Sequence, residues 1–193
     1  MRFLLGPIPD DPGFDPTLPG WNAIREPRPA LMNLIALPIM LVTLALMALF
    51  LRAFTSLKLT DLAAPFLIAF LLVIPVHELI HALAMPGSGR GGETMIGFWP
   101  SHLLFYAFHF GEMTRGNFLA VMIAPFVVLT IIPLAVLAAG VDSRFLGAVA
   151  IANGAAAAGD LLGFALILTQ IPRGAIVRNQ GWRTYWRILN VEF

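Results

Sequence analysis

Four long apolar segments dominate the sequence and restrict the folds that are open to it. They run over residues 34–51, 62–85, 119–139 and 145–171, and the first and third hold no charged residue. Each is long enough for a helix to cross the roughly 30 Å hydrocarbon layer of a bilayer. The chain of 193 residues is 59% hydrophobic and only 12% charged, whereas soluble domains are about 25% charged. The sequence therefore predicts a membrane protein.

The segments that flank these runs complete the predicted fold. Residues 1–30 are rich in proline, so we expect an extended cytoplasmic segment rather than a helix. Residues 31–171 form the predicted four-span domain, and the arginine- and tryptophan-rich residues 172–193 are typical of a cytoplasmic tail at the lipid headgroups. We expect an all-α membrane protein with about four transmembrane helices.

Two irregularities are expected within this domain. Between the second and third spans, "HLLFYAFHF" is typical of an aromatic strand and "GEMTRGN" of a turn, which predicts a small membrane-associated β-hairpin-like loop. Pro125 and Pro133 should break or kink the third span.

The basic residues predict the orientation. Four spans place both termini and the loop between the second and third spans on one side, together with nine of the 12 lysine and arginine residues. The other side holds Arg52, Lys58 and Arg144. By the positive-inside rule we expect a multi-pass protein of the cell (inner) membrane with both termini in the cytoplasm. The net charge of +1, without a basic patch, indicates no nucleic-acid partner, and the absence of cysteine excludes thiolate metal sites.

The second apolar segment contains the motif H-E-x-x-H, formed by His77, Glu78 and His81. On a helix, the two histidines lie on one face and can hold one zinc ion, while the glutamate can accept a proton from the attacking water. The alternative is an ordinary solvated helix face. Within a membrane span each ionisable group costs roughly 2.5–3.5 kcal/mol or more unless it has a partner or a function, so metal ligation is favoured.

A catalytic zinc ion needs a third protein ligand, and Asp160, His102, His109 and Glu112 are the candidates. Asp160 is the only acidic residue of the fourth segment, and it lies as far into that segment as His77 lies into the second. Because these two helices run in the same direction, both side chains should have a similar depth. His102 and His109 are interpreted as interfacial or structural, since their spacing places them on opposite faces of a strand.

The surroundings of Asp160 fit this interpretation. Small residues at positions 154–159 and 163 would let another helix approach closely. Asn153 precedes Asp160 by about two helical turns and so lies on the same face. It could bind the backbone of a substrate or form an interhelical hydrogen bond that holds the bundle, and the sequence leaves both roles open.

Residues 62–171 resemble the site-2 protease class of intramembrane zinc metalloproteases, and most closely the compact bacterial "putative zincin peptidase" family. The resemblance is carried by "HELIHAL", the glycine-rich loop, "MIAPF" in the third span and "NGAAAAGD" in the fourth. The sequence differs from the usual site-2 protease pattern because Leu161, not glycine, follows Asp160 and no proline separates Asn153 from Asp160.

The resemblance implies a role for each of the residues that match. His77, His81 and Asp160 would be zinc ligands. Glu78 would be the catalytic base, and Asn153 would lie near the substrate. The loop between the second and third spans would help to hold an extended substrate.

Two functions are therefore considered. The first is a zinc-dependent intramembrane peptidase that hydrolyses a membrane-embedded or juxtamembrane peptide bond near the cytoplasmic face, with Zn²⁺ as cofactor and with a membrane protein or peptide and the lipid bilayer as partners. The alternative is a non-hydrolytic metal-binding membrane protein, either a metal carrier or an inactive substrate-recognition adaptor. Glu78 favours the peptidase, since it has no evident use in a carrier, and so do the apolar outer halves of the second and fourth spans.

Overall fold

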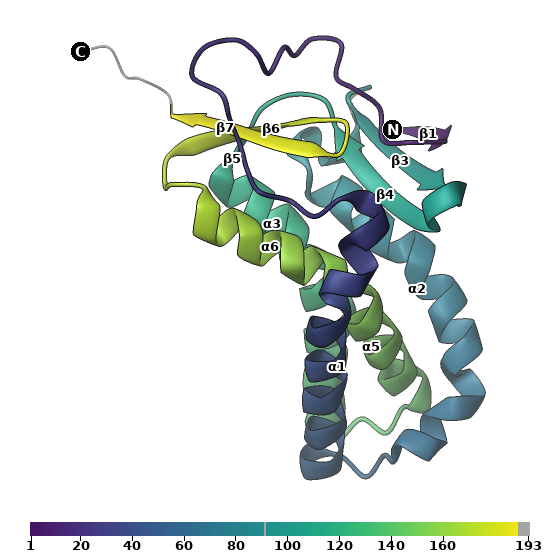
Figure 1. Ribbon diagram of the computed structural model, residues 1–193. Coiled ribbons are helices and arrows are strands. Elements are labelled where there is room, and N and C mark those ends of the chain that lie inside the picture. Colours follow the sequence, from purple (N-terminus) through teal and green to yellow (C-terminus); the bar gives the residue numbers. More distant parts are fainter. Residues whose placement is uncertain (91, 189–193) are drawn as a thin grey trace.

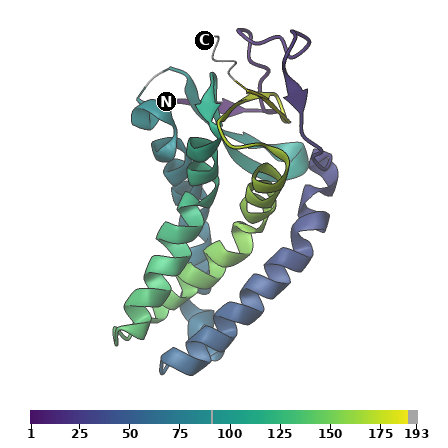
Figure 2. The same ribbon diagram turned by 90° about the vertical axis from the view of Figure 1, so that its left-hand side faces the viewer.

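The structure, a computed structural model, describes residues 1–90 and 92–188. Its helices form one bundle, and two small sheets cover one end of that bundle (Figure 1). The same arrangement is seen in the perpendicular view (Figure 2). The helices are α1 (Pro29–Phe54), α2 (Ala63–Ala84), α3 (Arg115–Phe126), α4 (Ile132–Ala138), α5 (Arg144–Ala156) and α6 (Ala158–Gln170), with short 3₁₀ turns at Leu59–Leu62, Pro86–Gly89 and Pro100–His102.

The helices present apolar side chains to their surroundings. Leu46 of α1 is 62% exposed and Leu67 of α2 is 66% exposed, which is unfavourable in water but suits a helix that faces lipid tails. In the described part of the chain, three helical stretches are long and apolar enough to cross a membrane: Pro29–Phe54, Leu59–Ala84 and Arg115–Ala138. The prediction of apolar helices compatible with a membrane protein is confirmed for these three.

The fourth predicted span is bent rather than straight. α5 and α6 meet at an angle of 51°, and they make a fourth span only if the pair is counted as one. Ala157 lies at the bend, where its ψ of 2° departs from helical geometry. The bend places Asp160 in the first turn of a new helix, so its depth is set by this break and not by fifteen residues of continuous helix.

The third span is irregular where its prolines predicted a break or kink. Between α3 and α4 lies one π-helical stretch, Val127–Ile131, which is flanked by Pro125 and Pro133. Such π-bulges occur frequently at functional sites. Here the stretch contains Thr130, which is fully buried and contributes to the site described below.

The first sheet has the strand order β1-β3-β4, formed by Arg2–Leu5, Thr94–Trp99 and Leu104–His109. β3 and β4 make an antiparallel hairpin, so the predicted hairpin-like loop exists. The partner of the aromatic strand differs from the prediction, because it lies before that strand in the sequence and not after it. The "GEMTRGN" stretch, predicted to be a turn, instead contains β5 (Met113–Thr114) and the start of α3.

The second sheet has the order β2-β7-β6-β5, in which β2 is Asn22–Ala23, β6 is Ala175–Gln180 and β7 is Arg183–Ile188. The prediction of an all-α fold with one hairpin was therefore incomplete, because both flanking segments also form strands. The extended N-terminal segment pairs with β7 through β2 and with β3 through β1.

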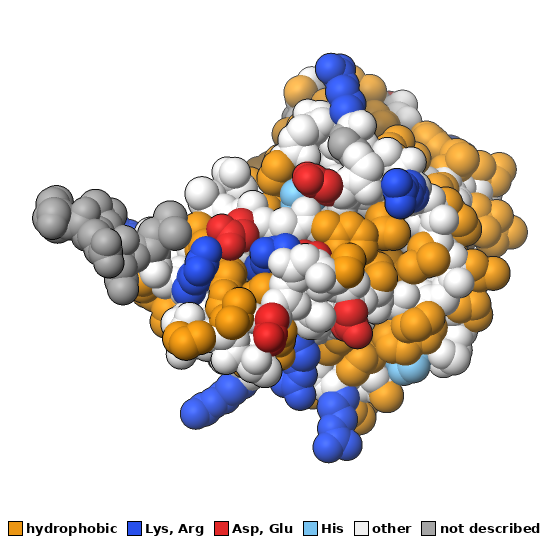
Figure 3. Space-filling view, turned by 90° about the horizontal axis from the view of Figure 1, so that it is seen from above, with side chains coloured by type: hydrophobic (Ala, Val, Ile, Leu, Met, Phe, Trp, Pro, Cys, Tyr) orange, Lys and Arg blue, Asp and Glu red, His pale blue; other side chains and the backbone are white. Residues whose placement is uncertain are grey.

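The C-terminal tail packs on protein in the second sheet. The Arg178 side chain, for example, lies 2.9 Å from the Asp11 carboxylate and over the ring of Phe14. This ion pair ties the tail to the N-terminal segment. From the end that carries the sheets, acidic and basic side chains are seen between apolar ones (Figure 3).

Candidate metal centre

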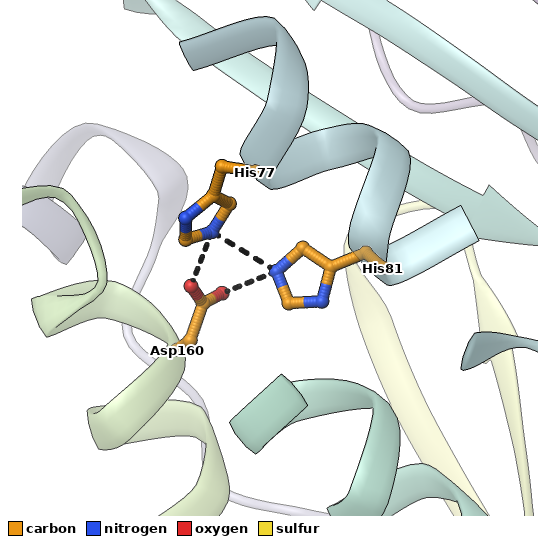
Figure 4. Close-up of side chains that lie close together, drawn as sticks. All are labelled: His77, His81 and Asp160. Carbon is orange, nitrogen blue, oxygen red and sulfur yellow. Dashed lines mark hydrogen bonds and ion pairs between the residues drawn. The ribbon is translucent and has the colours of Figure 1, made fainter. Parts of the chain in front are cut away.

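Three side chains that could bind a metal ion converge between α2 and the first turn of α6 (Figure 4). The His77 Nε2 atom lies 2.8 Å from Asp160 Oδ2, and the His81 Nε2 atom lies 3.3 Å from Asp160 Oδ1. The two Nε2 atoms are 3.1 Å apart. Both histidines come from successive turns of α2, and Asp160 comes from the first turn of α6. Among residues 1–90 and 92–188, this is the only such group placed to share a metal ion.

The separations between these atoms fit a zinc ion. With bonds of about 2.0–2.1 Å and tetrahedral angles, zinc holds its ligand atoms about 3.3–3.4 Å apart. The distances of 2.8, 3.1 and 3.3 Å between the imidazole and carboxylate atoms need only small outward shifts to reach this spacing. Two histidines and one carboxylate are also a known ligand set of catalytic zinc, which keeps a fourth position for water or substrate.

The Nδ1 atoms of the histidines set their tautomers. His81 Nδ1 is 2.8 Å from the Val121 carbonyl oxygen, which can only accept, so Nδ1 carries the proton. His77 Nδ1 is 2.8 Å from the Asn153 Oδ1 atom and donates to it. In the neutral rings, each Nε2 atom therefore directs its lone pair towards the other Nε2 atom and towards the Asp160 carboxylate. Such a cluster needs a cation between its members, either a proton or a metal ion.

Asn153 is fixed by its own contacts. Its Nδ2 atom donates to the Pro125 carbonyl oxygen at 3.0 Å and to Thr130 Oγ1 at 2.9 Å. Because that carbonyl only accepts, the amide must turn its oxygen to His77. The side chain is fully buried, and its polar atoms are engaged within the protein. These contacts fit the interhelical hydrogen bond considered above, whereas a contact with substrate would require them to be broken.

Glu78 lies in the wall of the cavity next to the metal-binding cluster. Its side chain is buried, and its carboxylate lies near the Ala107 N–H group of β4. β4 is an edge strand of the first sheet. Since the N–H group of Phe110 points inward to Glu93, the backbone groups of Phe105, Ala107 and His109 point away from β3. Glu78 thus lies between the metal-binding cluster and an open strand edge.

The other ligand candidates lie apart from this cluster. His102 is in a 3₁₀ turn beside Ser101, and Glu112 forms an ion pair with Arg187. His109 lines the cavity, but its Nδ1 atom is 3.1 Å from Thr94 Oγ1. Burial keeps the pKa of His109 below its usual range, although the nearby carboxylates oppose this shift. It is a neutral wall residue rather than a member of the triad.

Sequence reasoning missed four groups around the site: the Val121 and Pro125 carbonyls, the Ala107 N–H and the Thr130 hydroxyl. The first three belong to the backbone, so no residue type marks them. Thr130 had a usable signal, because it is the only polar residue in the apolar run 119–139.

The cluster opens into a cavity of about 260 Å³. One wall is formed by β4, from Leu104 to His109, and another by α3 and α6. The N-terminal segment and the β6–β7 hairpin also line the cavity, through Glu26, Pro27, Asn179, Trp182 and Thr184. We call these five residues the roof of the cavity.

An H-E-x-x-H helix whose histidines meet a carboxylate from a second helix defines a metal centre of the zincin type. Comparison with known families agrees: the model described as "Putative zincin peptidase" matches residues 70–176, more than half of the chain. The chain belongs to this family, and its membership indicates a zinc metallopeptidase. No curated protein and no solved structure matches the chain.

Proposed function

We propose that the protein is a zinc-dependent intramembrane peptidase of the site-2 protease type, which cleaves a membrane-embedded or juxtamembrane segment of a membrane protein near the cytoplasmic face. One observation carries the proposal. Two imidazole lone pairs, fixed by Asn153 and Val121, meet the Asp160 carboxylate at distances that suit zinc, and Glu78 lies in the same cavity.

The proposed mechanism assigns a task to each group. His77, His81 and Asp160 would hold zinc, which polarises the substrate carbonyl and makes the attacking water more acidic. Glu78 accepts the proton of that water and passes it to the leaving amine. The nearby Ala107 N–H group would stabilise the ionised Glu78 carboxylate before this transfer.

The edge of β4 supports the proposal of an extended substrate. A transmembrane helix keeps its carbonyl groups hydrogen-bonded, so a peptide bond becomes accessible only after local unwinding. The outward backbone groups of β4 would bind the unwound segment as an added strand, next to Glu78 and the metal-binding cluster. The positive-inside rule would place the end of the bundle that carries the sheets on the cytoplasmic side, so cleavage would take place near that face.

The packing on the other side of the cluster disfavours a metal carrier. A buried apolar cluster that includes Leu62, Ala69 and Val73 fills the bundle beyond His77. A carrier would need polar groups along that path.

The test measures metal content and cleavage together. Wild type, Glu78→Gln and Asp160→Ala are reconstituted in liposomes with a set of synthetic single-span peptides, and the products are identified by mass spectrometry. We expect Glu78→Gln to retain zinc but lose cleavage, and Asp160→Ala to bind zinc more weakly. Glu112→Gln and Asp142→Ala, which alter acidic residues outside the cavity, should behave as wild type.

Each failure has a distinct meaning. A wild type without stoichiometric zinc would refute both the peptidase and the non-hydrolytic metal protein. Normal cleavage by Glu78→Gln would refute the assigned base alone. Stoichiometric zinc without cleavage of any peptide in the set would favour the non-hydrolytic alternative.

A further inference from the structure

The roof of the cavity contains a carboxylate that the proposed mechanism does not use. Glu26 lies just before α1 and accepts two hydrogen bonds from Thr184 of β7, from its N–H group at 2.8 Å and from its hydroxyl at 2.7 Å. Beside it, the Trp182 Nε1 atom donates to the Pro27 carbonyl oxygen at 2.9 Å. These contacts fix Glu26 in the cavity wall. Residues 26 and 184 both lie outside the part of the chain that matches the family.

The charge of Glu26 is not balanced by a bound cation. In the described part of the chain, no lysine, arginine or histidine lies within ion-pair distance of its carboxylate. Burial raises the pKa of Glu26, while the Thr184 hydrogen bonds and the charge of Arg183 oppose that rise. A partly desolvated carboxylate of this kind gains free energy when a cationic group approaches it.

A second acceptor lies on the same part of the roof. Asn179 is directly opposite Thr184 in the β6–β7 pairing, so both side chains project from the same face of the hairpin. The Asn179 Oδ1 atom is enclosed and accepts no hydrogen bond from the residues that the structure describes. A hydrogen-bond donor that enters beside Glu26 would supply the hydrogen bond that this oxygen lacks.

The other charged residues that line the cavity also favour a cationic ligand. Its described lining residues include the carboxylates of Glu26, Glu78 and Asp160 but no lysine or arginine. Zinc would offset Asp160 and Glu78, which leaves Glu26 as the carboxylate of the cavity without a cation of the described residues in direct contact. A cavity of this composition favours a cationic ligand group.

We propose that Glu26, together with Asn179 and Thr184, forms a subsite for a lysine or arginine side chain of the substrate. This inference rests on the proposed function. Segments that flank transmembrane helices on the cytoplasmic side are enriched in lysine and arginine. A substrate strand that extends from the metal centre towards the roof therefore carries basic side chains to Glu26, which selects the cytoplasmic flank of the cleaved helix.

The experiment compares substrates that differ only in their flank. A cleaved single-span peptide is prepared with lysine, glutamine or glutamate at each successive position on the cytoplasmic side of the scissile bond, and kcat/KM is measured in liposomes. At one or two positions we expect wild type to prefer lysine over glutamine by roughly tenfold, the order of a charge-assisted hydrogen bond. In Glu26→Gln this ratio should fall to about one, mainly through KM.

Two variants separate charge recognition from support of the roof. Asp15→Asn removes a carboxylate of the same N-terminal segment that is bonded to Thr17 outside the cavity, and it should retain the lysine preference. Thr184→Val removes the hydroxyl that holds Glu26 but leaves the charge in place, so we expect the lysine preference to be reduced but not abolished. Thermal unfolding and zinc content are measured for every variant.

The cleavage rates of wild type are sufficient to refute the inference, even without the variants. If wild type cleaves lysine-, glutamine- and glutamate-flanked peptides equally, the subsite does not exist, although the peptidase proposal stands. If Glu26→Gln and Thr184→Val slow all three substrates alike, Glu26 only holds the roof. If wild type cleaves no peptide, the proposed function itself fails and the subsite fails with it.

Discussion

The hydrogen bond between Asn153 and His77 gives a quantitative prediction about the metal centre. Replacing Asn153 with alanine removes the acceptor that keeps the proton on His77 Nδ1 and the lone pair on Nε2. Loss of such an outer contact typically weakens metal binding 10–100-fold. We therefore expect the zinc dissociation constant of Asn153→Ala to rise by about this factor, or about 1.4–2.8 kcal/mol.

The same substitution should lower the stability of the protein itself. Asn153 takes part in three hydrogen bonds, with His77, Pro125 and Thr130. At about 1 kcal/mol each, their loss should reduce the free energy of unfolding by about 3 kcal/mol. A variant that merely destabilised the bundle would show this second effect without the first, so the two must be measured separately.

Thr130→Val is the matched control. It removes one of the two acceptors of the Asn153 Nδ2 atom but leaves the contact with His77, at nearly constant side-chain volume. We expect a loss of about 1 kcal/mol of stability and a dissociation constant for zinc close to that of wild type. Chelator competition gives the affinity, and thermal unfolding in detergent with and without zinc gives the stability.

One pattern of results would refute this reasoning. If Asn153→Ala bound zinc as tightly as Thr130→Val and differed from it only in melting temperature, Asn153 would hold the helices together and have no influence on His77. Weakened zinc binding in both variants would place the effect in the bundle as a whole. Only a loss of affinity confined to Asn153→Ala supports a positioning role.

Two further predictions concern β4. Ala107→Pro removes the N–H group that lies near Glu78 on an edge strand that tolerates proline. We expect kcat to fall by about 10–100-fold at unchanged zinc content, and an unchanged kcat would contradict the proposed role of this N–H group. Because burial lowers the pKa of His109, the unfolded state binds more protons below about pH 6.5. Stability should therefore decline as the pH falls through that range, and His109→Asn should show a shallower decline in melting temperature.

The candidate metal ligands could be found from the sequence because polar residues are conspicuous in an apolar segment. H-E-x-x-H and Asp160 stand in runs that are otherwise almost entirely apolar, so each needed a partner. Equal depth in two parallel helices led to the correct pairing of Asp160 with His77, although the structure sets the depth of Asp160 by the bend between α5 and α6. The bend at Ala157 was not predicted, since no proline or glycine occupies that position and alanine is a good helix former.

The role of Asn153 could not be decided in the same way. Its position on the face of Asp160 fitted a substrate contact and an interhelical contact equally well. The difference depends on where Pro125 and Thr130 lie, and the irregular third span determines that. Sequence periodicity assumes regular helices, so it cannot place groups on either side of a π-helical stretch.

The second sheet could not be predicted from local sequence patterns, because its strands come from distant parts of the chain. β2 has only two residues and pairs with Tyr185 and Trp186, more than 160 positions away in the chain. Neither an alternating pattern nor a turn signal marks such a strand. The roof of the cavity and the position of Glu26 depend on this pairing between the two ends of the chain, so the sequence did not predict them.

The sheets supply backbone hydrogen-bonding groups that the helices lack. A helix satisfies its own backbone groups, so a bundle of membrane helices has no free N–H or carbonyl groups with which to bind an extended peptide. The candidate metal ligands lie on helices, where packing holds them in place. An unwound substrate also needs a strand edge within reach of those ligands. β4 meets this need because it crosses the C-terminal end of α2 beside Glu78 (Figure 1). Joining a strand edge to a buried metal site is what would let a peptide bond from a membrane helix be held extended and hydrolysed in one cavity.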